Sequence, residues 1–275
     1  EICACLVGSE MCIRDRTIAV LYLLSTPPIY TRTAAILVKD NSKSSSSTSA
    51  MNDFSDLGIF KSNTNINNEL LTLKSPTLMT EVVNRLGLNE TFTIRKGLKN
   101  VDLYKVSPVT ITFCDKIEVP LSFTIKFSSK EAFAISELEI SGEDIGETLS
   151  AQMGDSIQTS AGIMIVSPTQ EFTDAFIGTS IRYVRGSVRA AVDTYSNALV
   201  AELGNEDATI INLSINDTSI RKAEDILNTL IEVYNENWIR DKNQIAVSTS
   251  QFISDRLGVI ESLSLIHISE PTRHA

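Results

Sequence analysis

A long helical pattern near the carboxyl end of the chain constrains the fold more than any other feature. Between Ile220 and Glu261, Gly258 is the only residue that favours breaking a helix, and a run of capping residues at 216–219 precedes this segment. At about 1.5 Å per residue, a helix of this length would extend roughly 60 Å. Its apolar face recurs at helical spacing through Ala223, Ile226, Leu227, Leu230, Ile231, Tyr234, Trp238, Ile245, Thr249, Phe252, Ile253, Leu257 and Ile260. Because residues 235–250 are markedly polar, we expect the projecting part of the helix to pack against another helix, in the same chain or in a neighbour.

The residues before this helix predict a mixture of strands and shorter helices. Apolar runs or strand alternation occur, with turn residues between them, within 106–185, at residues 109–113, 121–127, 134–140, 162–166 and 180–184. This pattern is typical of antiparallel β structure, and further strands are expected at 30–40 and 208–215. A helix is expected after Ser75 and Pro76, with Gly87 as its end, and another at 187–199. The predicted fold class is α+β, with an antiparallel or mixed sheet, packed helices and a long C-terminal helix. The serine-rich stretch 41–51 is expected to be a mobile loop.

The first part of the chain has the features of a membrane exit. Residues 17–24 form a short apolar run, which Pro27 and Pro28 end because paired prolines cannot continue a helix. Tyr22 and Tyr30 flank this exit, and aromatic rings favour the membrane–water interface. Since a membrane-spanning helix needs about 20 apolar residues, the run is either the end of such a helix or a buried strand or short helix. The residues alone leave both interpretations open.

The two ends of the chain, residues 1–16 and 263–275, resemble translated sequencing adapter. The transposon end ATG TGT ATA AGA GAC AG encodes Met11 to Asp15, and the opposite strand of the adapter encodes Leu263 to Arg273. Tags of this kind do not belong in reasoning about a fold. We therefore expect an internal fragment of a longer protein, with its own sequence confined to about 17–262. The competing interpretation of the first end is a metal or redox motif at Cys3 and Cys5.

Composition then excludes several classes of function. The whole chain holds 24 basic and 34 acidic residues, of which the adapter-like ends hold three basic and four acidic residues. The remainder therefore has 21 basic and 30 acidic residues, a net charge of −9. Such an acidic balance argues against nucleic-acid binding. The remainder contains no histidine and one cysteine, Cys114, which excludes an internal disulfide framework, a histidine general base and the usual zinc ligands. It contains no phosphate-binding loop. We expect no catalytic, cofactor or metal site in this segment.

Three arginines form the one basic cluster that stands out. Arg182, Arg185 and Arg189 could contact an anionic polymer such as a glycan, and ordinary ion pairing within an acidic chain is the alternative. Glu143 and Asp144 could similarly bind a divalent cation, although a solvated acidic loop is the more common explanation.

The order of the motifs resembles a known family. Residues 27–30 (PPIY) are followed by 68–75 (NELLTLKS), 82–88 (VVNRLGL), 226–231 (ILNTLI) and 249–257 (TSQFISDRL). This series is similar to the extracytoplasmic part of the Wzz-type chain-length determinants, polysaccharide co-polymerases that include the transmembrane regions of bacterial tyrosine autokinases. The β-rich insertion at 106–185 resembles the larger, autokinase-linked members.

The resemblance implies a membrane-anchored α+β domain over 30–219 and the first arm of a helical hairpin over 220–262. It further implies homo-oligomeric rings in the bacterial inner membrane, with this region in the periplasm, that act with the polymerase or export machinery of a surface polysaccharide. The expected function is a non-enzymatic scaffold that controls polysaccharide length or export. One alternative is the sensory half of a protein-tyrosine autokinase, whose kinase activity cannot be assigned to any residue here. A second is an unrelated membrane-tethered binding or adaptor domain.

Overall fold

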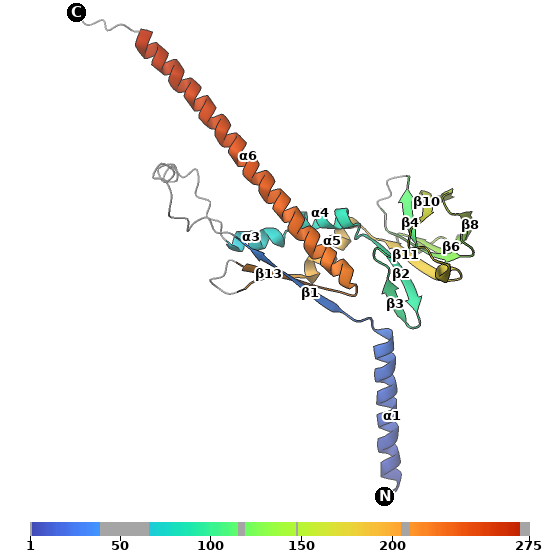
Figure 1. Cartoon of the computed structure of the whole chain (residues 1–275). Helices are drawn as coiled ribbons and strands as arrows, with labels where there is room; N and C mark the ends of the chain where they lie inside the picture. The colour runs from blue at the N-terminus through green and yellow to red at the C-terminus, as the bar shows by residue number, and fades with distance from the viewer. Residues whose placement is uncertain (1, 39–65, 115–118, 147, 205–209, 270–275) are drawn as a thin grey trace, which may run out of the picture. The chain divides into compact units, whose positions relative to one another are not determined.

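The computed structural model describes residues 2–38, 66–114, 119–146, 148–204 and 210–269 (Figure 1). The serine-rich stretch 41–51 lies outside these residues, as does the last part of the adapter-like segment, 270–275. The chain divides into two compact units after Leu230. The first unit holds all of the sheets, and the second consists of the continuation of the last helix.

The first unit is a mixed α+β structure with antiparallel sheets. Its helices are α1 (Ile2–Ser25), α3 (Ile66–Leu73), α4 (Pro76–Leu86), α5 (Val188–Ala198) and the start of α6 (Ile220–Ser269), with a short 3-10 helix, η2 (Asp174–Phe176). One three-stranded sheet has the order β1 (Tyr30–Leu37), β13 (Ile210–Asp217), β12 (Leu199–Leu203). A second has the order β4 (Val109–Phe113), β10 (Gly162–Pro168), β9 (Ser156–Thr159). The largest sheet runs β3 (Lys99–Asp102), β2 (Glu90–Lys96), β11 (Ser180–Arg185), β5 (Leu121–Phe127), β6 (Ala132–Ile140), β7 (Glu143–Asp144), with β8 (Leu149–Gln152) also paired to β6.

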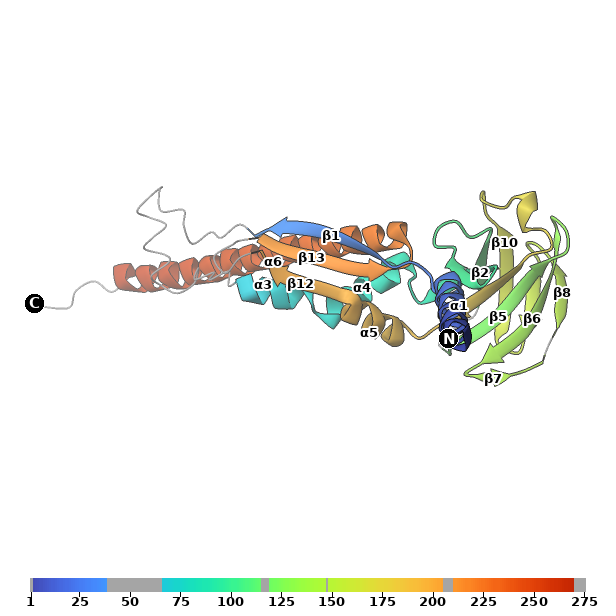
Figure 2. The same ribbon diagram turned by 90° about the horizontal axis from the view of Figure 1, so that it is seen from below.

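Helices cover one face of the β1–β13–β12 sheet (Figure 2). Alternate residues of β13, Ile211, Leu213 and Ile215, are almost completely buried. The same holds for four apolar residues on α4 and four near the start of α6: Leu78, Met79, Val82, Val83, Ala223, Ile226, Leu227 and Leu230. Because side chains alternate across a strand, the intervening residues of β13 lie on the opposite, more exposed face. Burial on one face only is the arrangement expected for an antiparallel sheet that packs on helices.

The larger sheet and the β4–β10–β9 sheet share a second hydrophobic core. The core is built from apolar side chains of seven strands and includes Phe123, Phe127, Phe133 and Tyr183, each at most 1% exposed. The Tyr183 ring lies 5.0 Å from the rings of both Phe92 and Phe123, at tilted angles that favour aromatic packing. This part of the chain therefore has a core of its own, large enough to hold the strands that line the candidate site.

Local sequence signals explain the short helix α4. The Ser75 hydroxyl accepts a hydrogen bond from the Thr77 backbone N–H at 3.3 Å, Pro76 occupies the first helical position, and Gly87 ends the helix in the left-handed region at φ 63°. This confirms the start and end predicted from the sequence. The expected strands at 109–113 and 121–127 are confirmed by β4 and β5, which have the same bounds.

Several boundaries differ from the predictions: β1 ends at Leu37 rather than at 40, and α6 continues past 262 to Ser269. The β-rich region predicted at 106–185 begins at Glu90, because β2 and β3 form a hairpin around Gly97, which has φ 64°. The helix predicted to end at 199 ends at Ala198, and Leu199 begins β12, which pairs with β13. In these last two places, pairing with a neighbouring strand of the sheet decides the structure of the segment.

Candidate functional site

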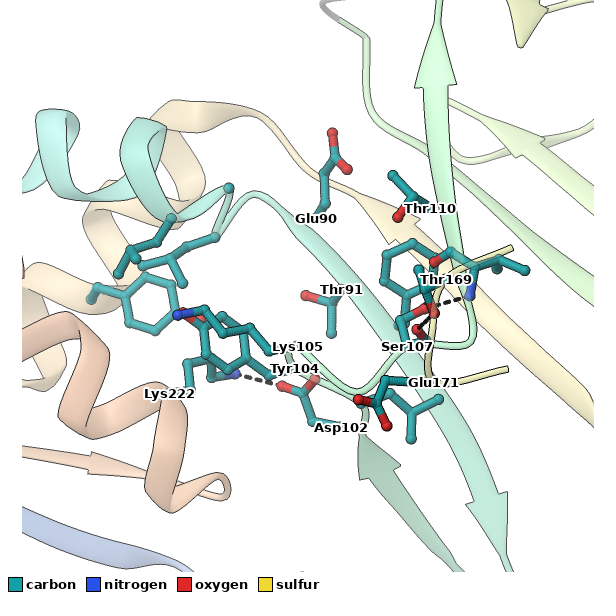
Figure 3. Close-up of a pocket in the computed structure, with 17 residues that line it drawn as sticks. Glu90, Thr91, Asp102, Tyr104, Lys105, Ser107, Thr110, Thr169, Glu171 and Lys222 are labelled. Carbon is teal, nitrogen blue, oxygen red and sulfur yellow. Dashed lines mark hydrogen bonds and ion pairs between the residues drawn. The ribbon is translucent and has the colours of Figure 1, made fainter. Parts of the chain in front are cut away.

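A cavity of about 330 Å³ lies in the first unit (Figure 3). Its wall comes from the end of α4, from β2, from the loop after β3, from β4, from the segment after β10, and from one residue each of α5 and α6. The polar lining residues are Glu90, Thr91, Asp102, Tyr104, Lys105, Ser107, Thr110, Thr169, Glu171, Tyr195 and Lys222. Small-molecule sites are usually concave and somewhat larger, so this cavity suits a small ligand.

Lys222 is a buried cation on one side of the cavity. It is 8% exposed, and its Nζ lies 2.6 Å from the Asp102 carboxylate and 3.3 Å from that of Asp217. Burial lowers the pKa of Lys222, but Tyr195 and the two carboxylates outweigh this effect and raise the pKa above its ordinary value. Lys222 therefore stays protonated at neutral pH, and it serves as a charge partner rather than as a base or nucleophile.

The loop after β3 brings a second charged pair to the cavity. Lys105 has φ 56°, a left-handed conformation that is uncommon for a residue with a side chain, and its Nζ lies 2.7 Å from the Asp225 carboxylate. The neighbouring Tyr104 hydroxyl oxygen is buried and has no well-formed hydrogen bond to a described residue. Burial, followed by the nearby Asp225 carboxylate, raises the pKa of Tyr104, so this hydroxyl is neutral and can both donate and accept.

The opposite side of the cavity carries hydroxyl groups. The Thr169 hydroxyl donates to the Ser107 carbonyl at 2.6 Å, and the Ser107 hydroxyl donates to the Val109 carbonyl at 2.7 Å, so that these two side chains hold the loop together. Thr91, Thr110 and Glu171 also line the cavity, and their side chains form no hydrogen bond or ion pair with any residue that the structure describes. These three groups are available to a ligand.

The structure keeps two of the three arginines predicted from the sequence together, Arg182 and Arg185, and places Arg189 apart from them. Arg182 lies 3.2 Å from the Glu139 carboxylate, whereas Arg185 lies 3.7 Å from Glu90 and over the Phe113 ring, with its guanidinium carbon 4.9 Å from the ring centroid. Both arginines border a second, shallow depression, whereas Arg189 is not among its lining residues and lies on α5. For Arg182 and Arg185, the contacts are those of ordinary ion pairing.

The predicted membrane-exit motif joins the first helix to the first strand. Helix α1 ends at Ser25, Pro27 and Pro28 follow in irregular structure, and Tyr30 begins β1 opposite Asp217. The helix runs without interruption from the adapter-like residues into residues 17–25. Among the described residues, none of the helices combines the length and apolar character that crossing a membrane requires.

The described residues contain no group of three or more His, Cys, Asp or Glu side chains arranged to hold a metal ion. Glu143 and Asp144 form the short strand β7 and are exposed. The groups that the structure does assemble are hydroxyls, paired charges and aromatic rings around the cavity. Such groups suit binding of a polar molecule.

No protein-family model matches this chain, and no curated protein matches it.

Sequence reasoning missed the cavity altogether. Its lining residues are spread from Leu86 to Lys222, and no motif spacing connects them. One signal was present: Lys222 falls beside the apolar face of the predicted long helix, close to Ala223, where a lysine needs a partner if it is buried.

Proposed function

We propose that this chain is the extracytoplasmic region of a Wzz-type polysaccharide co-polymerase, a non-enzymatic scaffold that controls the length or export of a surface polysaccharide. In this proposal it acts at the bacterial inner membrane, on the periplasmic side, as a homo-oligomer beside the polymerase or export machinery. The product would be a capsule, an exopolysaccharide or an O-antigen.

The observation that carries the proposal is an exposed apolar seam on α6. Trp238, Ile245, Phe252 and Val259 follow one another at intervals of seven residues, and each is at least 45% exposed. A strict seven-residue repeat places these side chains along one line of a helix, which is the pattern of helices that pack lengthwise on one another. Burying such a side chain stabilises an assembly by about 1.5–3 kcal/mol.

Two cations accompany the aromatic residues of the seam. Lys242 Nζ lies 5.4 Å from the centroid of the Trp238 ring, and the Arg256 guanidinium carbon lies 5.2 Å from that of Phe252. These contacts hold the rings in place along the helix surface. A scaffold that assembles through long helices needs such a seam, and an α+β unit before the long helix is what the resemblance to the co-polymerase family implies.

Deletion of the gene in its host, with complementation, tests the proposal. We expect deletion to alter the length distribution or the amount of surface polysaccharide on gels, and the wild-type gene to restore both. Phe252→Asp, which places a charge in the seam, should fail to restore them, whereas Ser254→Asp, which places the same charge on the opposite side of the helix, should succeed. An unchanged polysaccharide profile after deletion would refute the scaffold and favour an adaptor role.

A further inference from the structure

We infer that the cavity lined by β2, β4 and the loop after β3 binds one hydroxyl-rich sugar unit, neutral or amino-substituted, of the polysaccharide. The choice of ligand class rests on the proposed function, and the site itself rests on the geometry of the cavity. With a volume of about 330 Å³, the cavity lies near the lower end of the range for small-molecule sites. That size suits one or two sugar rings rather than a folded partner or a long peptide.

Uncommitted polar groups around the cavity match the needs of a sugar ring. Thr91 and Thr110 offer hydroxyls that can donate and accept, Glu171 offers a carboxylate that accepts, and none of the three is engaged elsewhere in the described chain. Figure 3 shows Thr91 near the middle of the lining, with Thr110 and Glu171 on the side of β4 and Thr169. Because a pyranose presents hydroxyls in several directions, donors and acceptors on different walls can bind it at the same time.

The buried hydroxyl of Tyr104 adds a second indication of a ligand. Its oxygen is shielded from solvent, and the Asp225 carboxylate is its one polar neighbour identified among the described residues, without a short hydrogen bond between them. The side chains of Phe92 and Tyr195 also line the cavity and supply apolar surface for the C–H groups of a sugar. The cavity thus combines unpaired polar atoms with aromatic surface.

The charge of the lining selects among sugars. Three carboxylates (Glu90, Asp102 and Glu171) and two ammonium groups (Lys105 and Lys222) border the cavity, which leaves one net negative charge. Both ammonium groups are already paired with carboxylates, Lys222 with Asp102 and Lys105 with Asp225. Glu171 has no such partner among the described residues. An amino sugar is therefore favoured over a neutral sugar, and a uronic acid is disfavoured.

Saturation-transfer NMR on the whole chain, with glucosamine, N-acetylglucosamine, glucose and glucuronate as probes, tests the site. We expect transfer to the ring protons of the first three sugars, strongest for glucosamine, and little transfer to glucuronate. Thr110→Val keeps the side-chain shape and removes one hydroxyl, so binding should weaken roughly three- to ten-fold. Glu171→Gln should remove the preference for glucosamine over glucose.

Matched variants separate this site from weak binding elsewhere. Thr112→Val changes the same residue type on the same strand and face but outside the lining, and Glu143→Gln neutralises an exposed carboxylate away from it. Both should bind as the wild-type chain does. Absence of transfer to every sugar, or equal weakening by Thr110→Val and Thr112→Val, would overturn the assignment. Gene deletion tests the scaffold function separately. If deletion alters the polysaccharide but the chain binds no sugar, the sugar site is refuted and the scaffold function stands. If the chain binds sugar but deletion leaves the polysaccharide unchanged, only the scaffold function is refuted.

Discussion

Replacement of Lys222 by methionine should destabilise the first unit more than any change to a surface charge. Lys222, Asp102 and Asp217 have side chains that are only 9–12% exposed, and the lysine is the one cation that both carboxylates contact in these ion pairs. Methionine keeps much of the side-chain length but leaves two buried carboxylates without their cation. Removal of one partner from a buried ion pair costs about 3–5 kcal/mol, because the remaining charge is uncompensated.

Lys130 provides the matched control. Its Nζ lies 2.8 Å from the Asp174 carboxylate, a distance similar to that in the buried pair, but the two side chains are 66% and 70% exposed. Pairs of this kind contribute about 0–1 kcal/mol. Lys130→Met should therefore change the free energy of unfolding by about 1 kcal/mol at most.

Urea denaturation followed by circular dichroism measures both variants. A further variant, Lys222→Met with Asp102→Asn and Asp217→Asn, removes the three charges together and should recover part of the lost stability, because no uncompensated carboxylate remains. The reasoning is refuted if Lys222→Met costs no more than Lys130→Met, or if the triple variant is less stable than Lys222→Met alone. Either result would mean that solvent already screens the three charges.

The structure also predicts the effect of alkaline pH on Tyr183 and the effect of alanine substitutions at two glycines. Burial, and then the Glu90 carboxylate, raises the pKa of Tyr183 above its ordinary value of 10.0, so its contribution to stability is complete below about pH 10 and is lost as the pH rises toward the folded-state value. In urea titrations at several alkaline pH values, this group should lower the free energy of unfolding by up to about 1.4 kcal/mol per pH unit. Tyr183→Phe should make this decrease shallower. An equal slope in the two proteins would contradict the assignment. Gly87→Ala should cost about 1 kcal/mol, because Gly87 has φ 63°. Gly186→Ala should cost less in thermal unfolding, because Gly186 has no positive φ and the new Cβ would lie 3.9 Å from the Asn89 carbonyl oxygen.

Local chemistry made α4 and several strands predictable from the sequence. Ser75, Pro76 and Gly87 act on the backbone within a few residues of themselves, so their positions mark the helix without knowledge of the rest of the fold. The alternation in β4 and β5 is equally local, since side chains on alternate faces of a strand face either the core or solvent. The α+β class and the long C-terminal helix follow from these same local patterns.

Strand pairing was not predictable in the same way. In β2, Ile94 pairs with Ile181 of β11, far along the chain. β12 continues directly from α5, and only its pairing with β13 makes it a strand. The cavity depends on such pairings, because they bring β2, the loop after β3 and β4 around one space.

Lys222 is a buried ion-pair partner in the fold, although no sequence motif marks it as one. A lysine in a long amphipathic helix is ordinarily a solvated charge, and its burial requires partners that this helix does not supply. Here Asp102 comes from the end of β3 and Asp217 from the end of β13, so one cation joins two sheets to the first turn of α6. The same lysine lines the cavity beside Tyr195. A ligand in the cavity would therefore lie beside the Lys222–Asp102 ion pair, which helps to fix the start of α6. We expect Lys222 variants to change both the stability of the first unit and the binding of sugars.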